Sequence, residues 1–211
     1  MHSNITGVIL AGGENRRVQS RKKAFFDIGG QPIIGRIYQV LAAVFPRTMI
    51  VTNTPLDFIE WNAVLATDIF PLRSSLTGIH AALFSIDTPY AFICACDAPF
   101  VKQELVETIA AGLTDNFDVV IPETAKGLEP LCAVYSVRCL EAIERQLRQQ
   151  QRFAIWHILK RLRVNTILEE KLRQSDPFLD SFMNVNTPAD LEQARRLMAD
   201  RDPAGDMKGL V

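Results

Sequence analysis

The stretch at residues 7–30 limits what this chain can fold into more than any other part of the sequence does. Apolar residues at positions 7–10 give way abruptly to three small residues and then to a loop rich in cations: Ala11, Gly12, Gly13, Arg16, Arg17, Arg21, Lys22 and Lys23. Glycine has no Cβ atom, so backbone N–H groups beside it can approach a phosphate closely, and the cations offset the phosphate charge. The order predicts a strand leading into a polyphosphate-binding loop, although surface loops without a ligand also collect Gly and Arg.

Length and composition favour one large domain. The 211 residues are 48% hydrophobic, which is enough to bury a sizeable core in a single α/β domain. We expect that domain to span residues 1–200. Residues 201–211 contain Pro, Gly and charges, and we expect them to form a flexible C-terminal tail. The net charge of −1 argues against a nucleic-acid partner, because general nucleic-acid binders are more basic.

The cysteines and the apolar runs indicate the cellular compartment in which we expect this protein. The four cysteines show neither paired CxxC spacing nor the density of a disulfide scaffold, which favours reduced thiols. No apolar run approaches the roughly 20 residues that a membrane-spanning helix needs, and the N-terminus does not resemble a signal peptide. We therefore expect a soluble, cytoplasmic protein with no membrane partner.

Strand and helix patterns alternate along the first half of the chain. Apolar runs predict strands at residues 5–10, 48–51, 64–66, 90–96 and 119–121. Between them, helical spacing predicts a helix with Pro32 in its first turn and another with Ser75 as its N-cap. This alternation predicts an α/β fold with three layers: a mostly parallel, doubly wound (Rossmann-like) sheet with helices on both faces.

After residue 123 the pattern changes. We expect strands at residues 128–135, 164–168 and 182–185, and helices at residues 140–150, 153–162 and 189–198. The helix at 140–150 has a polar face and the one at 153–162 has a basic end. No internal repeat or low-complexity linker divides this half from the first.

Polar residues follow several of the predicted strands. Gly12, Asn53, Asp68, Asp97 and Asn186 all fall at the carboxyl ends of strands, where ligands bind in open α/β sheets. A carboxylate directly after a buried strand must be solvated, paired or metal-bound to stay ionised. Since Mg²⁺ commonly takes one or two carboxylates together with substrate phosphates, Asp97 is a candidate magnesium ligand. The alternative is that Asp97 caps a helix in the sequence Asp-Ala-Pro.

Sequence motifs for other kinds of catalytic or binding site are absent or weak. No GxSxG motif surrounds a serine, the first glycines do not follow GxGxxG, and GxxxxGK[ST] is absent. His80 and His157 lie in predicted helices without a Cys or an acid at ligand spacing, so packing or solvation explains them better than metal binding. A hydrolase elbow, an NAD site and a Walker-type site are all disfavoured.

Taken together, several motifs identify a family. LAGG at residues 10–13, Arg16 and Arg17, Lys23, Gly30-x-Pro32, Asp97-x-Pro99, PL-x-A-x-Y within residues 129–135 and NVNTP at 184–188 resemble nucleotidyltransferases of the molybdenum cofactor guanylyltransferase type. The resemblance spans residues 5–196. LAGG with a following lysine is shared with sugar-phosphate nucleotidyltransferases, so the narrower assignment depends on the double arginine, the PL-x-A-x-Y segment and the NVNTP stretch.

The resemblance implies transfer of GMP from Mg-GTP to the terminal phosphate of molybdopterin, which gives the guanine dinucleotide form of the molybdenum cofactor and pyrophosphate. Proteins of cofactor synthesis and molybdoenzymes are the further partners it implies. By motif position, Asp97 holds Mg²⁺, and Asn184 and Asn186 lie near the reacting phosphate and the second substrate. The residues it assigns to the nucleotide and its phosphates are Leu10, Ala11, Gly12, Gly13, Arg17, Lys23, Asn53, Asp68 and Asp97, with Arg17, Lys23 and Asp97 as the catalytic set.

The loop after Arg17 departs from the family pattern. The family usually reads Met-Gly-Gly-x-Asp-Lys there, whereas this chain has Val18, Gln19, Ser20, Arg21, Lys22 and Lys23. Two alternatives therefore stay open: the same fold with CTP or a sugar phosphate as substrate, and a degenerate, non-catalytic nucleotide-binding protein. Asn186 favours GTP, because the family's cytidylyltransferases more often carry an aspartate at this position.

Overall fold

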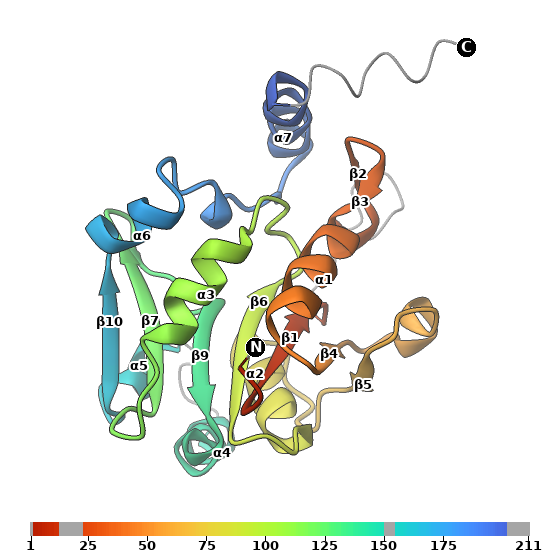
Figure 1. Ribbon diagram of the computed structural model, residues 1–211. Helices are drawn as coiled ribbons and strands as arrows, with labels where there is room; N and C mark the ends of the chain where they lie inside the picture. The colour runs from red at the N-terminus through yellow and green to blue at the C-terminus, as the bar shows by residue number, and fades with distance from the viewer. Residues whose placement is uncertain (1, 13–22, 150–154, 202–211) are drawn as a thin grey trace.

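The central sheet organises the molecule. The computed structural model describes residues 2–12, 23–149 and 155–201, and within them an eight-stranded sheet has the order β10-β7-β9-β6-β1-β4-β5, with β8 paired to β7 outside that path (Figure 1). The strands are β1 (Ile5–Leu10), β4 (Thr48–Val51), β5 (Val64–Ala66), β6 (Tyr90–Ala95), β7 (Val119–Thr124), β8 (Gly127–Leu128), β9 (Cys132–Ser136) and β10 (Val164–Leu168). A separate hairpin consists of β2 (Asp27–Ile28) and β3 (Gln31–Pro32).

Most strand pairs are parallel, as the sequence predicts. Within the central sheet, β1 pairs in parallel with both β4 and β6, β4 with β5, and β7 with β10, whereas β9 runs antiparallel to β6 and β7, and β8 runs antiparallel to β7. β4 is buried throughout, and β1 and β6 are buried except at their last residue. Burial on both faces explains why these strands read as continuous apolar runs.

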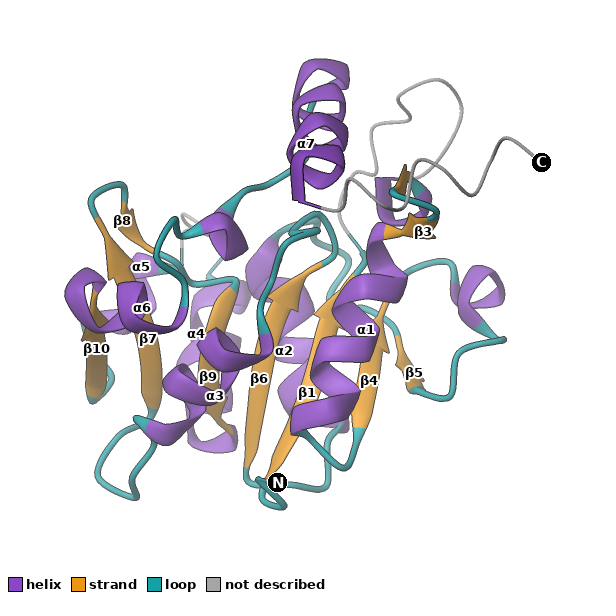
Figure 2. Ribbon diagram, turned by 45° about the horizontal axis from the view of Figure 1, so that its top comes forward, coloured by secondary structure: helices purple, strands orange, loops and turns teal. Residues whose placement is uncertain are grey.

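Helices cover both faces of the sheet (Figure 2). One core cluster packs the first face under α1 (Ile33–Val44), α3 (Gln103–Ala111) and α6 (Glu169–Ser175), and a second packs the other face under α2 (Ser75–Ser85), α4 (Leu140–Arg148) and α5 (Trp156–Leu159). The last helix, α7 (Pro188–Arg201), lies beyond the carboxyl ends of the parallel strands and contacts the hairpin strand β2. Short 3₁₀ turns are η1 (Lys23–Phe25), η2 (Pro55–Phe58), η3 (Val137–Cys139) and η4 (Asp180–Phe182). None of the helices in the described part of the chain is long and apolar enough to cross a membrane.

Two helix starts differ from prediction by one residue. Pro32 precedes α1 as its N-cap, with φ −63° and ψ 146°, and Ile33 is the first helical residue. The N-cap of α2 is Ser74, whose Oγ accepts a hydrogen bond from the Thr77 N–H at 3.2 Å, so the prediction of Ser75 is wrong. Adjacent serines offer the same capping chemistry, and the backbone at Ser74 has the extended conformation that a cap requires.

Two predicted strands are wrong in part or whole. The expected strand at 128–135 is divided into β8 and β9, because Pro130 lacks the N–H that a continuous ladder needs. The expected strand at 182–185 is absent: η4 ends at Phe182, and the Val185 N–H donates instead to the backbone carbonyl of Asp97 at 2.8 Å.

The C-terminal helices differ in length from their predictions. The helix expected at 153–162 is the short α5, and residues 150–154 lie outside the described part of the chain. α7 extends three residues beyond the predicted end, to Arg201, which is the first residue of the expected tail. Residues 202–211, the rest of that tail, lie outside the described residues.

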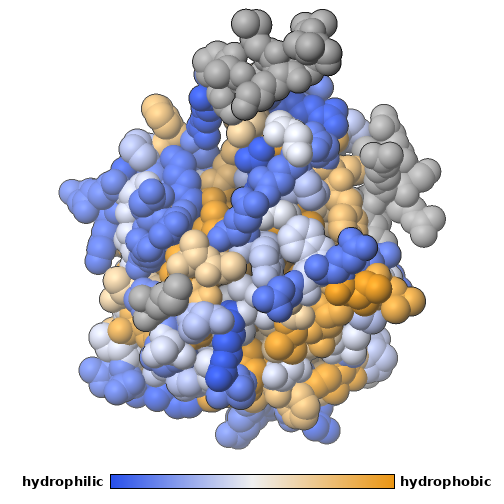
Figure 3. All heavy atoms as spheres, turned by 45° about the vertical axis from the view of Figure 1, so that its right-hand side comes forward, coloured by the Kyte–Doolittle hydropathy of each residue, from blue (hydrophilic) through white to orange (hydrophobic). Residues whose placement is uncertain are grey.

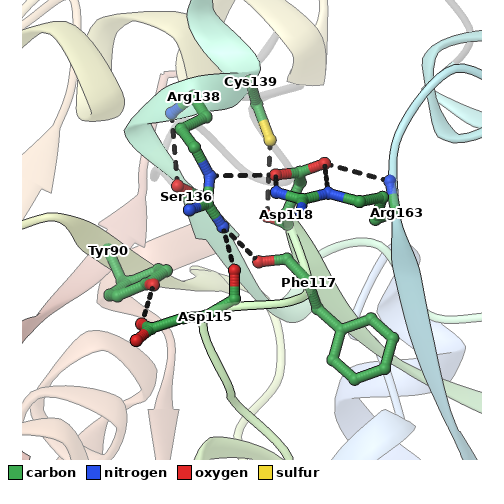
Figure 4. Close-up of polar contacts among 8 residues, drawn as sticks. All are labelled: Tyr90, Asp115, Phe117, Asp118, Ser136, Arg138, Cys139 and Arg163. Carbon is green, nitrogen blue, oxygen red and sulfur yellow. Dashed lines mark hydrogen bonds and ion pairs between the residues drawn. The ribbon is translucent and has the colours of Figure 1, made fainter.

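A polar cluster joins three segments at the amino-terminal edge of β7 (Figure 4). Asp118 is buried and accepts hydrogen bonds from Arg138 Nε at 3.0 Å and from Arg163 Nη2 at 2.8 Å, while the Arg163 backbone N–H donates to its second oxygen at 3.0 Å. Arg163 holds the pKa of the Asp118 carboxyl at about 2, below its usual range. The cluster thereby ties the starts of β7 and β10 to η3.

The opposite edge of the sheet is short and partly apolar. β5 has only three residues and pairs with β4 alone, and the neighbouring side chains of Leu56, Ile59 and Val64 are exposed. Figure 3, in which this side comes forward, shows apolar side chains gathered on the surface. A very short edge strand limits pairing with other chains.

Candidate active site

Four neighbouring parallel strands end at the same edge of the sheet. Their order β6-β1-β4-β5 places Asp97, Gly12, Asn53 and Asp68 along this edge in that sequence. Backbone hydrogen bonds continue past the strand ends and keep the following residues in register: Cys96 N–H to the Leu10 carbonyl at 3.1 Å, Ala11 N–H to Val51 at 2.8 Å, and Thr52 N–H to Ala66 at 2.8 Å.

A cavity of about 590 Å³ opens at this edge. The sequence-predicted residues that line it are Leu10, Gly12, Lys23, Asp68, Asp97, Asn184 and Asn186. Ala11 and Asn53 do not line the cavity: Ala11 is buried, and Asn53 donates a hydrogen bond to Asp68, which does line it. Gly13 and Arg17 lie outside the described residues, as do Gln19, Ser20 and Lys22.

Lys23 and Asn186 meet at the cavity. Lys23 begins η1, after the cation-rich loop, and its Nζ donates to Oδ1 of Asn186 at 2.6 Å. An ammonium group has three donors, so among the described residues this contact leaves two for an anionic ligand. The contact joins the N-terminal loop to the segment before α7.

The segment at 184–186 is fixed by its backbone. The Val185 N–H bonds to the Asp97 carbonyl, and the N–H groups of Asn186 and Thr187 both donate to the Asp190 carboxylate at 2.8 and 2.7 Å. These two bonds and a third from the Thr187 hydroxyl lower the pKa of Asp190. Asn184 and Asn186 are exposed and line the cavity on either side of buried Val185.

Asp97 does not cap a helix. The next helix, α3, begins at Gln103 with Lys102 at its N-cap, so the capping alternative for Asp97 is excluded. Its carboxylate makes no side-chain hydrogen bond or ion pair to another residue in the described ranges. Burial raises the pKa of Asp97, while the Lys23 ammonium and the residue's own backbone N–H oppose that rise.

The oxygen ligands at Asp97 suit a metal ion whose coordination shell is completed by the phosphates of the substrate. Within the described residues no group of three or more His, Cys, Asp or Glu side chains could hold a metal by itself. Mg²⁺ does not need such a group, because one or two carboxylates with substrate phosphates and water suffice. A half-buried carboxylate facing a cavity with Lys23 nearby has this character.

Asn53 and Asp68 form a pair at the other end of the edge. Asn53 Nδ2 donates to Asp68 Oδ2 at 2.7 Å, and the Asp68 N–H donates to Asn53 Oδ1 at 3.3 Å. Asp68 Oδ1 is buried and has no hydrogen-bond partner in the described part of the structure. Burial raises the pKa of Asp68, and the bond from Asn53 opposes the rise.

Gly12 is not required by the fold around it. A Cβ atom built at Gly12 would lie 3.6 Å from the Val51 carbonyl oxygen, which is ordinary contact, and the residue does not adopt a positive φ. The absence of a side chain at Gly12 therefore leaves room for a ligand in the cavity and is not needed for packing within the protein. This is expected of a glycine beside a phosphate.

Sequence reasoning missed part of the lining. Arg73, Ser74, Ser75 and Gly78, from the loop before α2 and from its first turn, also face the cavity, as does Leu131. The sequence signal for Arg73, Ser74 and Ser75 was the position of their loop, which follows Asp68 and the carboxyl end of β5. Cys96 lines the cavity as well, but burial raises the pKa of its thiol to about 12, so it stays neutral.

Comparisons with known proteins identify the family and the fold. A family profile described as the MobA-like NTP transferase domain matches residues 7–166. A molybdenum cofactor guanylyltransferase of Desulfosudis oleivorans is 53% identical over 190 residues, which cover 90% of this chain and 94% of that protein. The crystal structure of molybdopterin-guanine dinucleotide biosynthesis protein A from Archaeoglobus fulgidus superimposes with a TM-score of 0.80 at 30% identity and covers 92% of this chain and 99% of that one. A 2-C-methyl-D-erythritol 4-phosphate cytidylyltransferase from Thermus thermophilus, at 15% identity over 91% of this chain and 98% of its own, has a TM-score of 0.64 and shares the fold.

Proposed function

Because the chain belongs to the MobA-like NTP transferase family, we propose that it transfers GMP from Mg-GTP to the terminal phosphate of molybdopterin. A phosphate oxygen of molybdopterin attacks the α-phosphorus of GTP, the bond from that phosphorus to the β-phosphate oxygen breaks, and pyrophosphate leaves. The products are the guanine dinucleotide cofactor and pyrophosphate.

The observation that carries the proposal is the convergence of Lys23, Asp97 and Asn186 on one cavity. These residues come from three distant parts of the chain and meet where four strands end. A cation, a carboxylate suited to Mg²⁺ and an amide, with a second amide at Asn184 in the same lining, suit two phosphates and a metal. The chemical names of the relatives, above all the 53% identical one, support guanosine and molybdopterin as the two substrates.

We assign the roles as follows. Leu10, Ala11, Gly12 and Gly13 hold the nucleotide along the turn after β1, and Asn53 with Asp68 lines the guanosine pocket. Lys23 and Arg17 contact phosphate oxygens. Asn184 and Asn186 hold the acceptor phosphate, with Asn186 already oriented by Lys23.

Asp97 would hold Mg²⁺ together with the phosphates. When bound, the metal supplies charge neutralisation at the phosphates and helps to align them. Burial favours this role, since the free carboxylate pays a desolvation cost that a cation removes.

No protein nucleophile is needed. The attacking group is already an anionic phosphate, so neither a strong general base nor a covalent intermediate is required. The side chains of the described cavity accordingly act by alignment and electrostatic stabilisation of the transition state.

Pyrophosphate release tests the proposal. With Mg-GTP and molybdopterin we expect stoichiometric pyrophosphate and the guanine dinucleotide product, and no release when molybdopterin is omitted. Preference for CTP over GTP would overturn the guanine assignment. Tight Mg-GTP binding without turnover would instead identify a degenerate nucleotide-binding protein, the alternative that Gln19, Ser20 and Lys22 raise.

A further inference from the structure

The cavity has two chemically different ends. Adjacent strands in a sheet are about 4.8 Å apart, so the three steps from β6 to β5 separate the Asp97 end from the Asp68 end by about 14 Å. One metal ion therefore cannot contact both carboxylates. Lys23 and Asn186 lie at the Asp97 end, which leaves the Asp68 end for the part of the nucleotide remote from the reacting phosphates.

Arg73 is the cation on the loop that leaves the Asp68 end, five positions after Asp68 in the chain. It lines the cavity, is exposed, and makes no ion pair or side-chain hydrogen bond within the described ranges. Arg138 and Arg163, by contrast, are committed to Asp118. A guanidinium left without a partner in a ligand cavity is available to a ligand.

The loop that carries Arg73 is anchored on both sides. At its start, the Asp68 N–H bonds to Asn53 Oδ1. In its middle, the Phe70 ring packs edge-on against the buried ring of His80, with centroids 4.9 Å apart. At its end, Ser74 caps α2. The backbone of Arg73 is thus held in place before a ligand arrives, which lowers the entropy cost of binding.

The polar groups at this end complement guanine. Guanine presents two acceptors, O6 and N7, that a guanidinium contacts in bidentate fashion. Adenine places a donor where guanine has O6, and cytosine lacks the second ring and its N7. Asp68, the neighbouring acceptor, has one oxygen without a partner, which suits the donors that guanine carries beside O6.

We propose that Arg73 is a specificity-determining residue that donates hydrogen bonds to O6 and N7 of the guanine base. The inference rests on the proposed function, because it presupposes that GTP occupies this cavity. It assigns to a residue of the β5–α2 loop the discrimination between GTP and other nucleoside triphosphates.

Binding of nucleotide analogues tests the role. Isothermal titration of the full chain with Mg-GTP, Mg-7-deaza-GTP and Mg-CTP is compared for the wild type, Arg73→Ala and Arg73→Lys. Loss of a bidentate contact should make Arg73→Ala bind GTP roughly 5- to 150-fold more weakly, which corresponds to about 1–3 kcal/mol. Arg73→Ala should change CTP binding little. Arg73→Lys should recover only part of the lost GTP affinity, because an ammonium group cannot donate the two parallel hydrogen bonds of a guanidinium.

The 7-deaza analogue supplies the decisive comparison. It lacks the N7 acceptor, so it should bind the wild type more weakly than GTP does, and the difference should shrink in Arg73→Ala. Arg161→Ala, which removes an exposed arginine outside the cavity, is the matched control and should leave all three affinities unchanged. Equal weakening of GTP and CTP would show a phosphate contact and overturn the inference, as would unchanged GTP binding. Failure of the wild type to bind any triphosphate would overturn the proposed function instead.

Discussion

Lys23 and Asn186 are 163 positions apart in the chain, yet the Nζ of Lys23 donates to Oδ1 of Asn186 at 2.6 Å. The bond connects the loop proposed to hold the nucleotide phosphates with the segment proposed to hold the acceptor phosphate. One ammonium group therefore lies where the proposed function brings the two phosphates together, and we expect its loss to affect turnover more than folding.

Lys23→Met should weaken Mg-GTP binding by at least tenfold and lower turnover further, because it removes the positive charge and keeps the length of the side chain. Lys23 is only half-buried, so the melting temperature should change little. Titration calorimetry and pyrophosphate release measure the two effects. Lys160→Met removes an exposed lysine that lies over Trp156, and serves as the charge control. Normal turnover in Lys23→Met would contradict the phosphate role.

Asp97→Asn should abolish turnover and the dependence of GTP binding on Mg²⁺. Burial raises the pKa of Asp97, so the ionised form is disfavoured in the folded state, and a neutral isostere should leave stability at pH 7 unchanged or slightly higher. Thermal melting and GTP titration with and without Mg²⁺ check both statements. The control is Asp200→Asn, an exposed carboxylate on α7. Near-normal activity in Asp97→Asn would refute the metal role.

Gly12→Ala should fold normally and bind Mg-GTP poorly. The added methyl group meets only ordinary contacts within the protein, with 3.6 Å as the shortest, so unfolding free energy should change by less than about 1 kcal/mol. The same methyl group occupies space that a nucleotide needs beside the backbone. Chemical denaturation and nucleotide titration separate the effects. A large loss of stability, or unchanged affinity, would be evidence against this role for Gly12.

Asp118→Asn should make stability less dependent on pH. The folded pKa of Asp118 is depressed to about 2, so its stabilisation is fully present above the unfolded value near 3.8 and is lost as pH falls toward 2. The depression corresponds to at most about 2 kcal/mol. Asp118→Asn should therefore be destabilised by about 1–2 kcal/mol at pH 7, and the difference from the wild type should shrink below about pH 4 and vanish only below about pH 2. Denaturation across this pH range measures it, with Glu141→Gln, whose ion pair is exposed, as the control. A difference that does not depend on pH would contradict the assignment.

The sequence predicts the strands of the sheet well and the segments that complete the cavity less well. Runs such as residues 90–96 identify buried parallel strands because burial on both faces leaves an unbroken apolar pattern. The location of Asp97, Gly12 and Asp68 at one edge follows from those strands. By contrast, the conformation at 182–185 depends on a long-range bond from Val185 to Asp97, which local pattern does not encode. Arg73 was missed for a similar reason: its loop follows the carboxyl end of a predicted strand, but the local sequence does not show which side chains of that loop line the cavity.

The attachment of Val185 to the Asp97 carbonyl has a consequence for how activities diversify on this fold. The residues that we propose for the nucleotide lie at consecutive strand ends of the sheet, whereas those that we propose for the acceptor lie on one late segment held mainly through backbone atoms. The side chain at 184 can change without disturbing those backbone bonds, but a change at 186 also removes the partner of Lys23. A transferase of this architecture can therefore alter its acceptor preference at position 184 while the nucleotide side stays intact, whereas a change at 186 affects both substrates.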